Sequence, residues 1–267
     1  MNNKSVQINA QDYVVYNKEA NQAFPHRQNH QMHHALNNAL RQAVADGAAE
    51  IVLNNVYGQR YLGTDLQTAN LHITINGTPG NDLAFAMNGP TIVVNGNAQD
   101  GTGNTMNEGV IIIHGQAGDI TGLSARGGEI YVRDDVGYRA GIHMKEYGDK
   151  HPVLVVGGCT QDFAGEYMAG GLFILLGLNL QQGEKYRAQF MGTGMHGGLI
   201  YIRGDFDEKE LGSEVGVTDP SAEDLVIIQR YVENYVRYFG GDTQEIMSKA
   251  FKKLYPKYLR PYGRLYC

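Results

Sequence analysis

A repeat of 19 residues constrains the fold of this chain more than any other feature of its sequence. Residues that end successive short apolar runs recur at this spacing, at Gly58, Gly77, Gly96, Gly115 and Asp134, and later at Gly158 and Gly177. Two intervals are longer, 24 residues from Asp134 to Gly158 and 27 from Gly177 to Gly204. Self-similarity at a fixed period is typical of chains built from stacked structural repeats.

Each repeat has the same internal order. A small residue stands seven positions after the end residue, a methionine or small apolar residue follows three positions later, and one or two glycines precede the next apolar run. These runs are TIVV, VIII, EIYV, VLVV, LFILL and LIYI. They are rich in β-branched and aromatic residues, bounded by glycine and too short for helices, so they predict strands.

A unit of this length cannot bury both faces of its own short strand, whereas stacked copies can pair their strands and fill one continuous interior. We therefore expect a mainly β fold, a parallel β-helix of about seven coils of ~19 residues, and at ~4.8 Å per coil a rod about 35 Å long. Glycines with a positive φ or a close backbone neighbour are expected at its corners. These structural corner residues are Gly77, Gly96, Gly115, Gly128, Gly158, Gly171, Gly177, Gly198 and Gly204.

Composition changes along the chain and suggests three regions. Of 35 glycines, 29 lie between residues 49 and 205, so the glycine excess belongs to the repeat. We expect an N-terminal cap over residues 1–48, the β-helix over 49–205 and a C-terminal helical extension over 206–267. The two long intervals place extra residues near 147–151 and 181–189. We expect both to form partner-facing loops whose deletion weakens partner binding but leaves the fold intact.

The N-terminal region predicts short strands at 6–9 and 13–16, followed by a helix over 31–46. Met32, Leu36, Leu40 and Val44 lie four apart on one face of that helix, and Gly47 follows its end. Such a helix would cap the open end of the rod. His26, His30, His33 and His34 surround the helix, but no cysteine or acidic residue lies at ligand spacing, which disfavours a metal site.

The C-terminal region predicts two helices. Asp219–Pro220–Ser221 would open the first, which extends to about Phe239, and the second would begin at Thr243 and end before Pro256. The tail has no acidic residue after Glu245 and is basic and aromatic. It is interpreted equally well as a solvated basic face or as a docking segment for an acidic partner.

Charge and cysteine content narrow the functional classes. The net charge is −6, and residues 49–205 hold 15 acidic against 9 basic side chains, which argues against nucleic-acid binding. Cys159 and Cys267 form no disulfide framework or metal-ligand spacing, and their roles are left open. The chain begins without a charged-then-apolar leader and has no run of ~18 apolar residues, so no membrane association and a cytoplasmic location are expected.

Two familiar motifs occur in the wrong context. Residues 192–197, GTGMHG, match the dinucleotide-binding pattern G-x-G-x-x-G, but a predicted strand follows them where a phosphate-binding helix is needed. Residues 122–126, GLSAR, approach the nucleophile elbow of hydrolases, yet Arg126 stands where glycine is required. Neither motif therefore predicts nucleotide binding or serine hydrolysis.

Other polar residues recur on the repeat. His114, His143 and His196 could each act as a base, and His143 and His196 are kept as alternative catalytic candidates, although no nucleophile recurs beside them. A ladder formed by Asp82, Asp100, Asp119 and Asp162 could hold a cation, but capping of corner amides is the expected role. From the residues alone, no catalytic, cofactor-binding or metal site is predicted.

The repeats resemble the GXGXG repeat of the glutamate synthase C-terminal domain. The coils GNAQDGTGNTMNEGVIII, GQAGDITGLSARGGEIYV and GEYMAGGLFILLG carry the resemblance. NNVYGQRYLG before them and GTGMHGGLIYIRG and RPYG after them agree with a stand-alone version of that domain. The resemblance is strongest over residues 50–205 and implies a right-handed parallel β-helix without catalytic residues of its own.

The resemblance also implies partners. In that family the domain lies between a glutaminase (amidotransferase) and an FMN- and iron–sulfur-containing synthase that forms glutamate from 2-oxoglutarate. This chain would be the scaffold subunit, with FMN and the cluster in partner subunits and no cofactor of its own. Three alternatives stay open beside it: the β-helix subunit of a formylmethanofuran dehydrogenase complex, a subunit of an N-methylglutamate synthase, and a stand-alone adaptor. A homo-oligomer is also compatible with the sequence.

Overall fold

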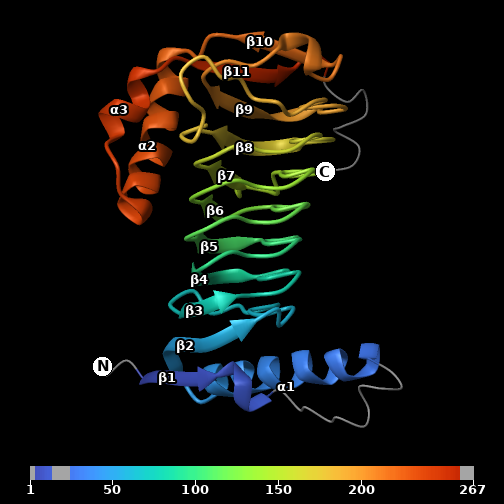
Figure 1. Cartoon of the computed structure of the whole chain (residues 1–267), viewed down its shortest axis with the longest axis vertical. Helices are drawn as coiled ribbons and strands as arrows, with labels where there is room; N and C mark the ends of the chain where they lie inside the picture. Colours follow the sequence, from blue (N-terminus) through green and yellow to red (C-terminus); the bar gives the residue numbers. More distant parts are fainter. Residues whose placement is uncertain (1–3, 14–24, 259–267) are drawn as a thin grey trace.

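The computed structural model describes residues 4–13 and 25–258, and within them one sheet of eleven strands forms a wall of a β-solenoid (Figure 1). The strand order is β1-β2-β3-β4-β5-β6-β7-β8-β9-β11-β10, so the sheet follows the chain until its last two strands. The parallel strands are β1 (Lys4–Asn9), β2 (Ala48–Tyr57), β3 (His72–Thr78), β4 (Asn88–Asn95), β5 (Glu108–Ile113), β6 (Glu129–Val132), β7 (Val153–Val156), β8 (Ala169–Leu175) and β9 (Gly197–Arg203). The predicted stack of parallel coils is confirmed.

The register keeps equivalent apolar residues in line from coil to coil. One inward column consists of Ile73, Ile92, Ile111, Ile130, Leu154, Phe173 and Ile200, each paired with the next. None of these side chains is more than 2% exposed, and complete burial of such a side chain contributes about 1.5–3 kcal/mol. A one-residue slip would turn the whole column outward, so the column fixes the 19-residue register.

The number of coils is slightly smaller than expected. The steps from β3 to β9 make six turns, whereas the repeat predicted about seven. The step from β2 to β3 is irregular, because the pairing changes register between Leu53 and Val56 and Asn55 there has a φ of +58°. A first repeat that departs from the others is usual at the end of a solenoid.

One corner of each coil explains the GXGXG pattern. Three alternate residues there have positive φ, such as Gly101, Gly103 and Thr105 with values of 71°, 71° and 57°. The middle position faces the interior, where a Cβ on Gly165 would lie 2.6 Å from Cδ1 of Ile200. The outer two positions also accept larger residues, and even the β-branched Ile120 has a φ of +52°. Only the middle position therefore requires a small residue.

The nine glycines expected at corners occupy two kinds of position. Seven have positive φ, whereas Gly115 and Gly158 do not and instead lie close to the backbone of the previous coil. Several of the seven lie within strands and not at corners. Gly171, for example, lies in β8 where the pairing with β9 shifts register between Ala169 and Leu172, which is a bulge.

Aspartates beside the corners accept backbone hydrogen bonds, as predicted. Asp100 Oδ1 accepts from the Asp119 amide at 2.9 Å, Asp119 Oδ1 accepts from the Tyr138 amide at 2.9 Å, and Asp162 Oδ1 accepts from the Gln189 amide at 2.8 Å. Asp82 differs, because its carboxylate accepts from the Asn104 side chain at 3.0 Å. No cluster of three or more potential metal ligands occurs within the described ranges.

Replacing Asp119 with alanine should therefore cost about 1–2 kcal/mol, since the corner amide of Tyr138 would lose its acceptor. Urea unfolding measures this loss. Asp149→Ala, on the exposed hairpin near residue 148, is the matched control and should stay within about 0.5 kcal/mol of the parent. Equal stabilities of the two variants would contradict a capping role for Asp119.

The N-terminal end of the solenoid is closed by β1, the short helix η1 (Ala10–Tyr13) and helix α1 (Pro25–Ala45) (Figure 1). The predicted strand at 6–9 is part of β1, while Tyr13 ends η1 and the rest of the strand predicted at 13–16 lies outside the described residues. Helix α1 begins at Pro25, earlier than predicted, and proline is well suited to a first helical position. Leu36 and Leu40 on its inward face are buried in the core, as expected.

The opposite end is closed differently from the prediction. Helix α2 (Ala222–Phe239) agrees with it, but α3 (Thr243–Ser248) is short and is followed by strand β11 (Phe251–Pro256). β11 pairs antiparallel with β9 and with β10 (Val215–Thr218). The prediction of a second long helix was wrong. The edge of β9 needs a pairing partner, and β11 supplies it while burying Phe251 and Leu254.

Helix α2 covers the outer face of the later strands (Figure 1). A second core forms between them, and it includes Tyr131, Val155, Ile174 and Tyr201 from the sheet and Ile228, Val232 and Tyr235 from α2. The N-terminus of α2 carries a capping box between Ser221 and Asp224. Several basic residues of the C-terminal region serve internal contacts, with Lys252 on Asp219 at 2.7 Å and Lys253 on Asp224 at 2.8 Å.

Candidate interaction surface

The outer positions of the GXGXG corner carry large side chains in the second half of the solenoid. One outer position holds Arg139, Phe163 and Phe190 on successive coils, and the other holds His143 and Tyr167. Because coils stack in register, these side chains lie above one another on the surface. We call the surface formed by Tyr138, Arg139, His143, Phe163, Tyr167 and Phe190 the aromatic corner face.

Ring contacts order the aromatic corner face. The rings of Phe163 and Phe190 stack with centroids 5.1 Å apart and an interplanar angle of 16°, and the Arg139 guanidinium lies 4.7 Å from the Phe163 centroid. The rings of His143 and Tyr167 stack at 5.4 Å and 12°. Gly194 leaves room for this second stack, because a Cβ there would lie 2.5 Å from the Tyr167 ring. The side chains are thus held in place while their outer faces remain open.

A single ion pair anchors this surface. Arg139 Nε donates to Glu166 Oε2 at 2.9 Å, and the glutamate side chain is only 12% exposed. The pair fixes the guanidinium beside the Phe163 ring, where a cation–π contact is favourable. Phe190 remains 46% exposed and Tyr167 47% exposed. Ordered, exposed aromatic side chains beside an arginine have the composition of protein–protein interface hot spots.

The two histidines retained as catalytic alternatives lie in different settings. His143 is exposed and stacked on Tyr167, and His196 has Nδ1 3.3 Å from the Gly194 carbonyl oxygen. Within the described residues, neither ring is hydrogen bonded to a serine or cysteine side chain. His143 therefore belongs to the aromatic corner face, and neither ring has the partner that a nucleophile–base pair requires.

The surroundings of Cys159 and His114 indicate that both residues have structural roles. The pKa of the Cys159 thiol is raised to about 11, mainly by burial, and Sγ lies 3.4 Å from Asn179 Oδ1. A thiol with this pKa is protonated and unreactive at neutral pH. His114 packs edge-on against Phe239 at 5.1 Å, and burial followed by the charge of Arg133 lowers its pKa. Cys267 lies outside the described residues.

The two insertions differ in their relation to the core. The first forms a small turn closed by a bridge between Tyr147 and Lys150, with Tyr147 68% exposed. In the second, Tyr186 and Ala188 are buried in the solenoid core. Deleting residues 181–189 would remove these core contacts, so the expectation that this loop can be deleted without harm to the fold is wrong. The hairpin near 147–151 carries no comparable core residue.

The aromatic corner face escaped the sequence prediction for a physical reason. The GXGXG spacing marks the corner, but positive φ at Phe163 and Phe190 is unexpected for bulky residues. Recurrence of arginine and aromatic residues at one corner position in consecutive repeats was the available signal.

Fold and surface together define a class, a parallel β-solenoid with helical and antiparallel caps and an exposed aromatic corner. The chain belongs to the GXGXG motif family, whose model matches residues 14–262. A related protein of Methanocaldococcus jannaschii, an uncharacterized protein, is 48% identical over 222 residues, which cover 81% of this chain and 85% of that protein.

A solved structure has a similar fold. It is a chain of the formyltransferase/hydrolase complex FhcABCD from Methylorubrum extorquens, crystallised with methylofuran. The TM-score is 0.57 at 19% identity, over 80% of this chain and 76% of that chain. At this identity the likeness concerns the fold. Within the described ranges, no helix has the length and apolar character needed to cross a bilayer.

Proposed function

We propose that this protein is a non-catalytic scaffold subunit of a glutamate synthase-type complex. It would hold a glutaminase subunit and an FMN-containing synthase subunit in register, with FMN and an iron–sulfur cluster in the partners. The observation that supports this proposal most directly is the aromatic corner face, whose exposed stacked rings line one edge of a rigid rod. A solenoid with coils in fixed register suits such a role because it can present separated surfaces at a constant spacing.

A second candidate function is supported by the solved structure with a similar fold. Its chain is part of a multi-subunit formyltransferase/hydrolase complex, so this protein would instead be a subunit of a formylmethanofuran-dependent complex. Both candidates share one consequence, that the chain works with partner subunits. They differ in which partners it binds.

Isolation of the full chain with its natural partners, followed by mass spectrometry, distinguishes the two candidates. Recovery of an amidotransferase and an FMN protein is the expected result for the glutamate synthase-type complex. Recovery of hydrolase or formyltransferase subunits would favour the second candidate. A chain that is repeatedly recovered alone would contradict both.

Changing the aromatic corner face should weaken partner binding. Tyr167→Ser combined with Phe190→Ser removes the outer rings of both stacks, and truncation of such anchors typically costs about 2 kcal/mol or more, or about 30-fold in affinity. Tyr57→Ser is the matched control, because Tyr57 is 89% exposed but lies on the first coil. Thermal unfolding of both variants checks that the fold is retained. Partner recovery equal to that of the Tyr57 variant would contradict the assignment of this surface.

A further inference from the structure

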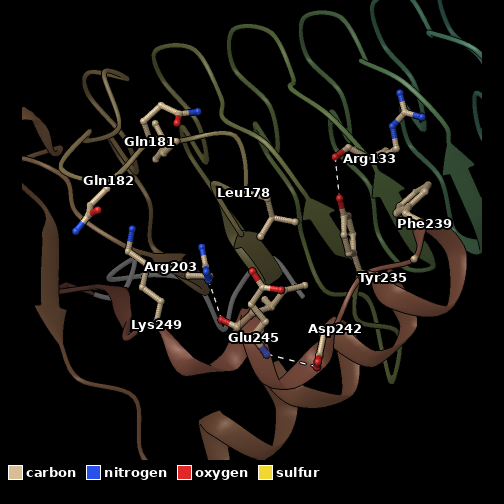
Figure 2. Close-up of a pocket in the computed structure, with 14 residues that line it drawn as sticks. Arg133, Leu178, Gln181, Gln182, Arg203, Tyr235, Phe239, Asp242, Glu245 and Lys249 are labelled. Atoms are coloured by element: carbon tan, nitrogen blue, oxygen red, sulfur yellow. Dashed lines mark hydrogen bonds between the residues drawn. The ribbon is translucent and has the colours of Figure 1, made fainter.

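A groove opens between the loop that follows β8 and the turn that joins α2 to α3 (Figure 2). Its volume is about 510 Å³, and its lining includes Leu178 and Leu180 from the loop and Ile246 of α3. A hollow of this size accommodates a small organic molecule. A smaller hollow of about 380 Å³ adjoins it and shares Arg133, Leu178 and Tyr235.

Two cationic side chains converge at one end of this groove. Arg203 Nε donates to the Ile246 carbonyl oxygen at 2.7 Å and Nη1 donates to the Leu176 carbonyl oxygen at 3.2 Å, which pins the guanidinium to the floor. Lys249 folds over Gly204, where a Cβ would lie 2.9 Å from Nζ. Figure 2 shows the ends of both side chains directed into the same space below Gln181 and Gln182.

Neither cation has an acidic partner within the described residues. No carboxylate of the described ranges lies within 4.0 Å of Arg203 or Lys249, although seven ion pairs form elsewhere in that part of the chain. The pKa of Arg203 is lowered, and burial of the guanidinium is the main cause. The two carbonyl acceptors satisfy part of this half-buried guanidinium but do not neutralise its charge, so an anion in the groove would be favourable.

The same groove holds an unpaired carboxylate. Glu245 lines it, and its negative charge acts on Arg203 without forming an ion pair with it. Asp242 also lies at the rim, but its carboxylate is already occupied as the N-cap of α3, where it accepts from the amides of Gln244 and Glu245. Among the described residues that line the groove, Glu245 is therefore the acidic group free to meet a ligand.

We propose that this groove binds a small zwitterionic ligand, an α-amino acid with an apolar side chain. Arg203 and Lys249 hold its carboxylate, Glu245 meets its ammonium group, and Leu178 and Leu180 contact its alkyl chain. Charge-assisted hydrogen bonds of this kind are short and strong, and opposite charges within one groove favour a ligand that carries both. The site is independent of the aromatic corner face and goes beyond a scaffold role.

The test is calorimetric titration of the full chain with four probes: L-norleucine, hexanoate, hexylamine and inorganic phosphate. Norleucine should bind saturably with a dissociation constant of about 1 mM or less, tighter than the other three. Lys249→Met should weaken norleucine binding by about tenfold or more. The Glu245→Gln variant should bind norleucine no more tightly than it binds hexanoate.

Arg187→Met supplies the matched control, because Arg187 is on the same loop but its side chain is 93% exposed outside the groove. It should bind norleucine like the parent. Arg203 is left unchanged because it ties β9 to α3 and its loss could affect folding, whereas Lys249 and Glu245 form no side-chain bond within the described residues. Absence of saturable norleucine binding to the parent, or binding that both the Lys249 and Glu245 variants retain, would overturn the proposal. Phosphate binding as tight as norleucine would also overturn it and indicate a plain anion site.

Discussion

Gly128→Val should prevent the solenoid from forming a stable fold. Gly128 has a φ of +77°, and a Cβ there would lie 2.8 Å from the Gly109 carbonyl oxygen and 2.5 Å from Cε of Met106. Neither neighbour can withdraw freely, because Gly109 belongs to the coil below and Met106 is fully buried. We expect a loss of at least about 4 kcal/mol, measured by urea unfolding or seen as insoluble protein.

The control for this variant separates backbone strain from overlap. Gly183 has a φ of +84°, but nothing lies within 4 Å of its Cβ position. Gly183→Val should therefore cost only the strain of a left-handed residue, about 1–2 kcal/mol. If the Gly128 variant were no less stable than the Gly183 variant, close coil packing would not be the reason for glycine at this position.

Asp224→Ala should cause the second large loss, because this carboxylate connects three elements. It accepts from the Tyr201 hydroxyl of β9 at 2.6 Å and the Lys253 ammonium of β11 at 2.8 Å, and it closes the capping box of α2 with Ser221. Its side chain is 8% exposed, so its removal leaves Lys253 and Tyr201 without a buried partner. Breaking a buried pair in this way costs about 3–5 kcal/mol.

A matched pair lies beside it. Asp219 binds Lys252 at 2.7 Å between the same two segments, but these side chains are 81% and 44% exposed. Asp219→Ala should therefore cost at most about 1 kcal/mol. Similar losses in the two alanine variants, measured by chemical unfolding at pH 7, would mean that burial is not what makes the Asp224 contact strong.

Asp224 should also make a large contribution to how the free energy of unfolding changes at acidic pH. Burial alone would raise its pKa, but hydrogen bonds from Lys253, Tyr201 and Ser221 outweigh it and lower the pKa to about 2. The pKa of an aspartate in the unfolded chain is about 3.9. Because the folded value is the lower one, the contribution is present above about pH 4 and is lost as the pH falls toward about 2. In Asp224→Ala, the slope of stability against pH over this range should become shallower.

Much of the solenoid could be predicted because its information is local and repeated. The 19-residue spacing placed β3 to β6 in register, and the aspartates beside the corners were assigned the amide-capping role that Asp100, Asp119 and Asp162 have. The C-terminal region could not be predicted in the same way. The segment from Phe251 to Pro256 closely follows helix α3, and pairing with the otherwise free edge of β9 makes it a strand.

The functional surfaces needed the tertiary structure for a related reason. Phe163 and Phe190 are 27 residues apart in sequence, and their stacking depends on how the long insertion is accommodated. The groove combines Arg203 of β9, Lys249 after α3 and the loop at 178–182, three segments whose contact no spacing indicates. The groove arises from the packing of α2 and α3 against the sheet, whereas the ring stack arises from the stacking of two coils across the insertion.

The 19-residue repeat alone predicts the parallel coils, their register and the need for small residues at inward corner positions. The reason is that each repeat carries the same residue pattern, which specifies the same backbone geometry and the same inward column. Each coil therefore provides the same evidence for the fold. The folded structure was needed to show how the ends are closed, which side chains form the aromatic corner face, and which charges meet in the groove. The caps and the groove depend on segments that fold onto the solenoid from elsewhere in the chain, and the aromatic corner face depends on side chains that differ from one coil to the next.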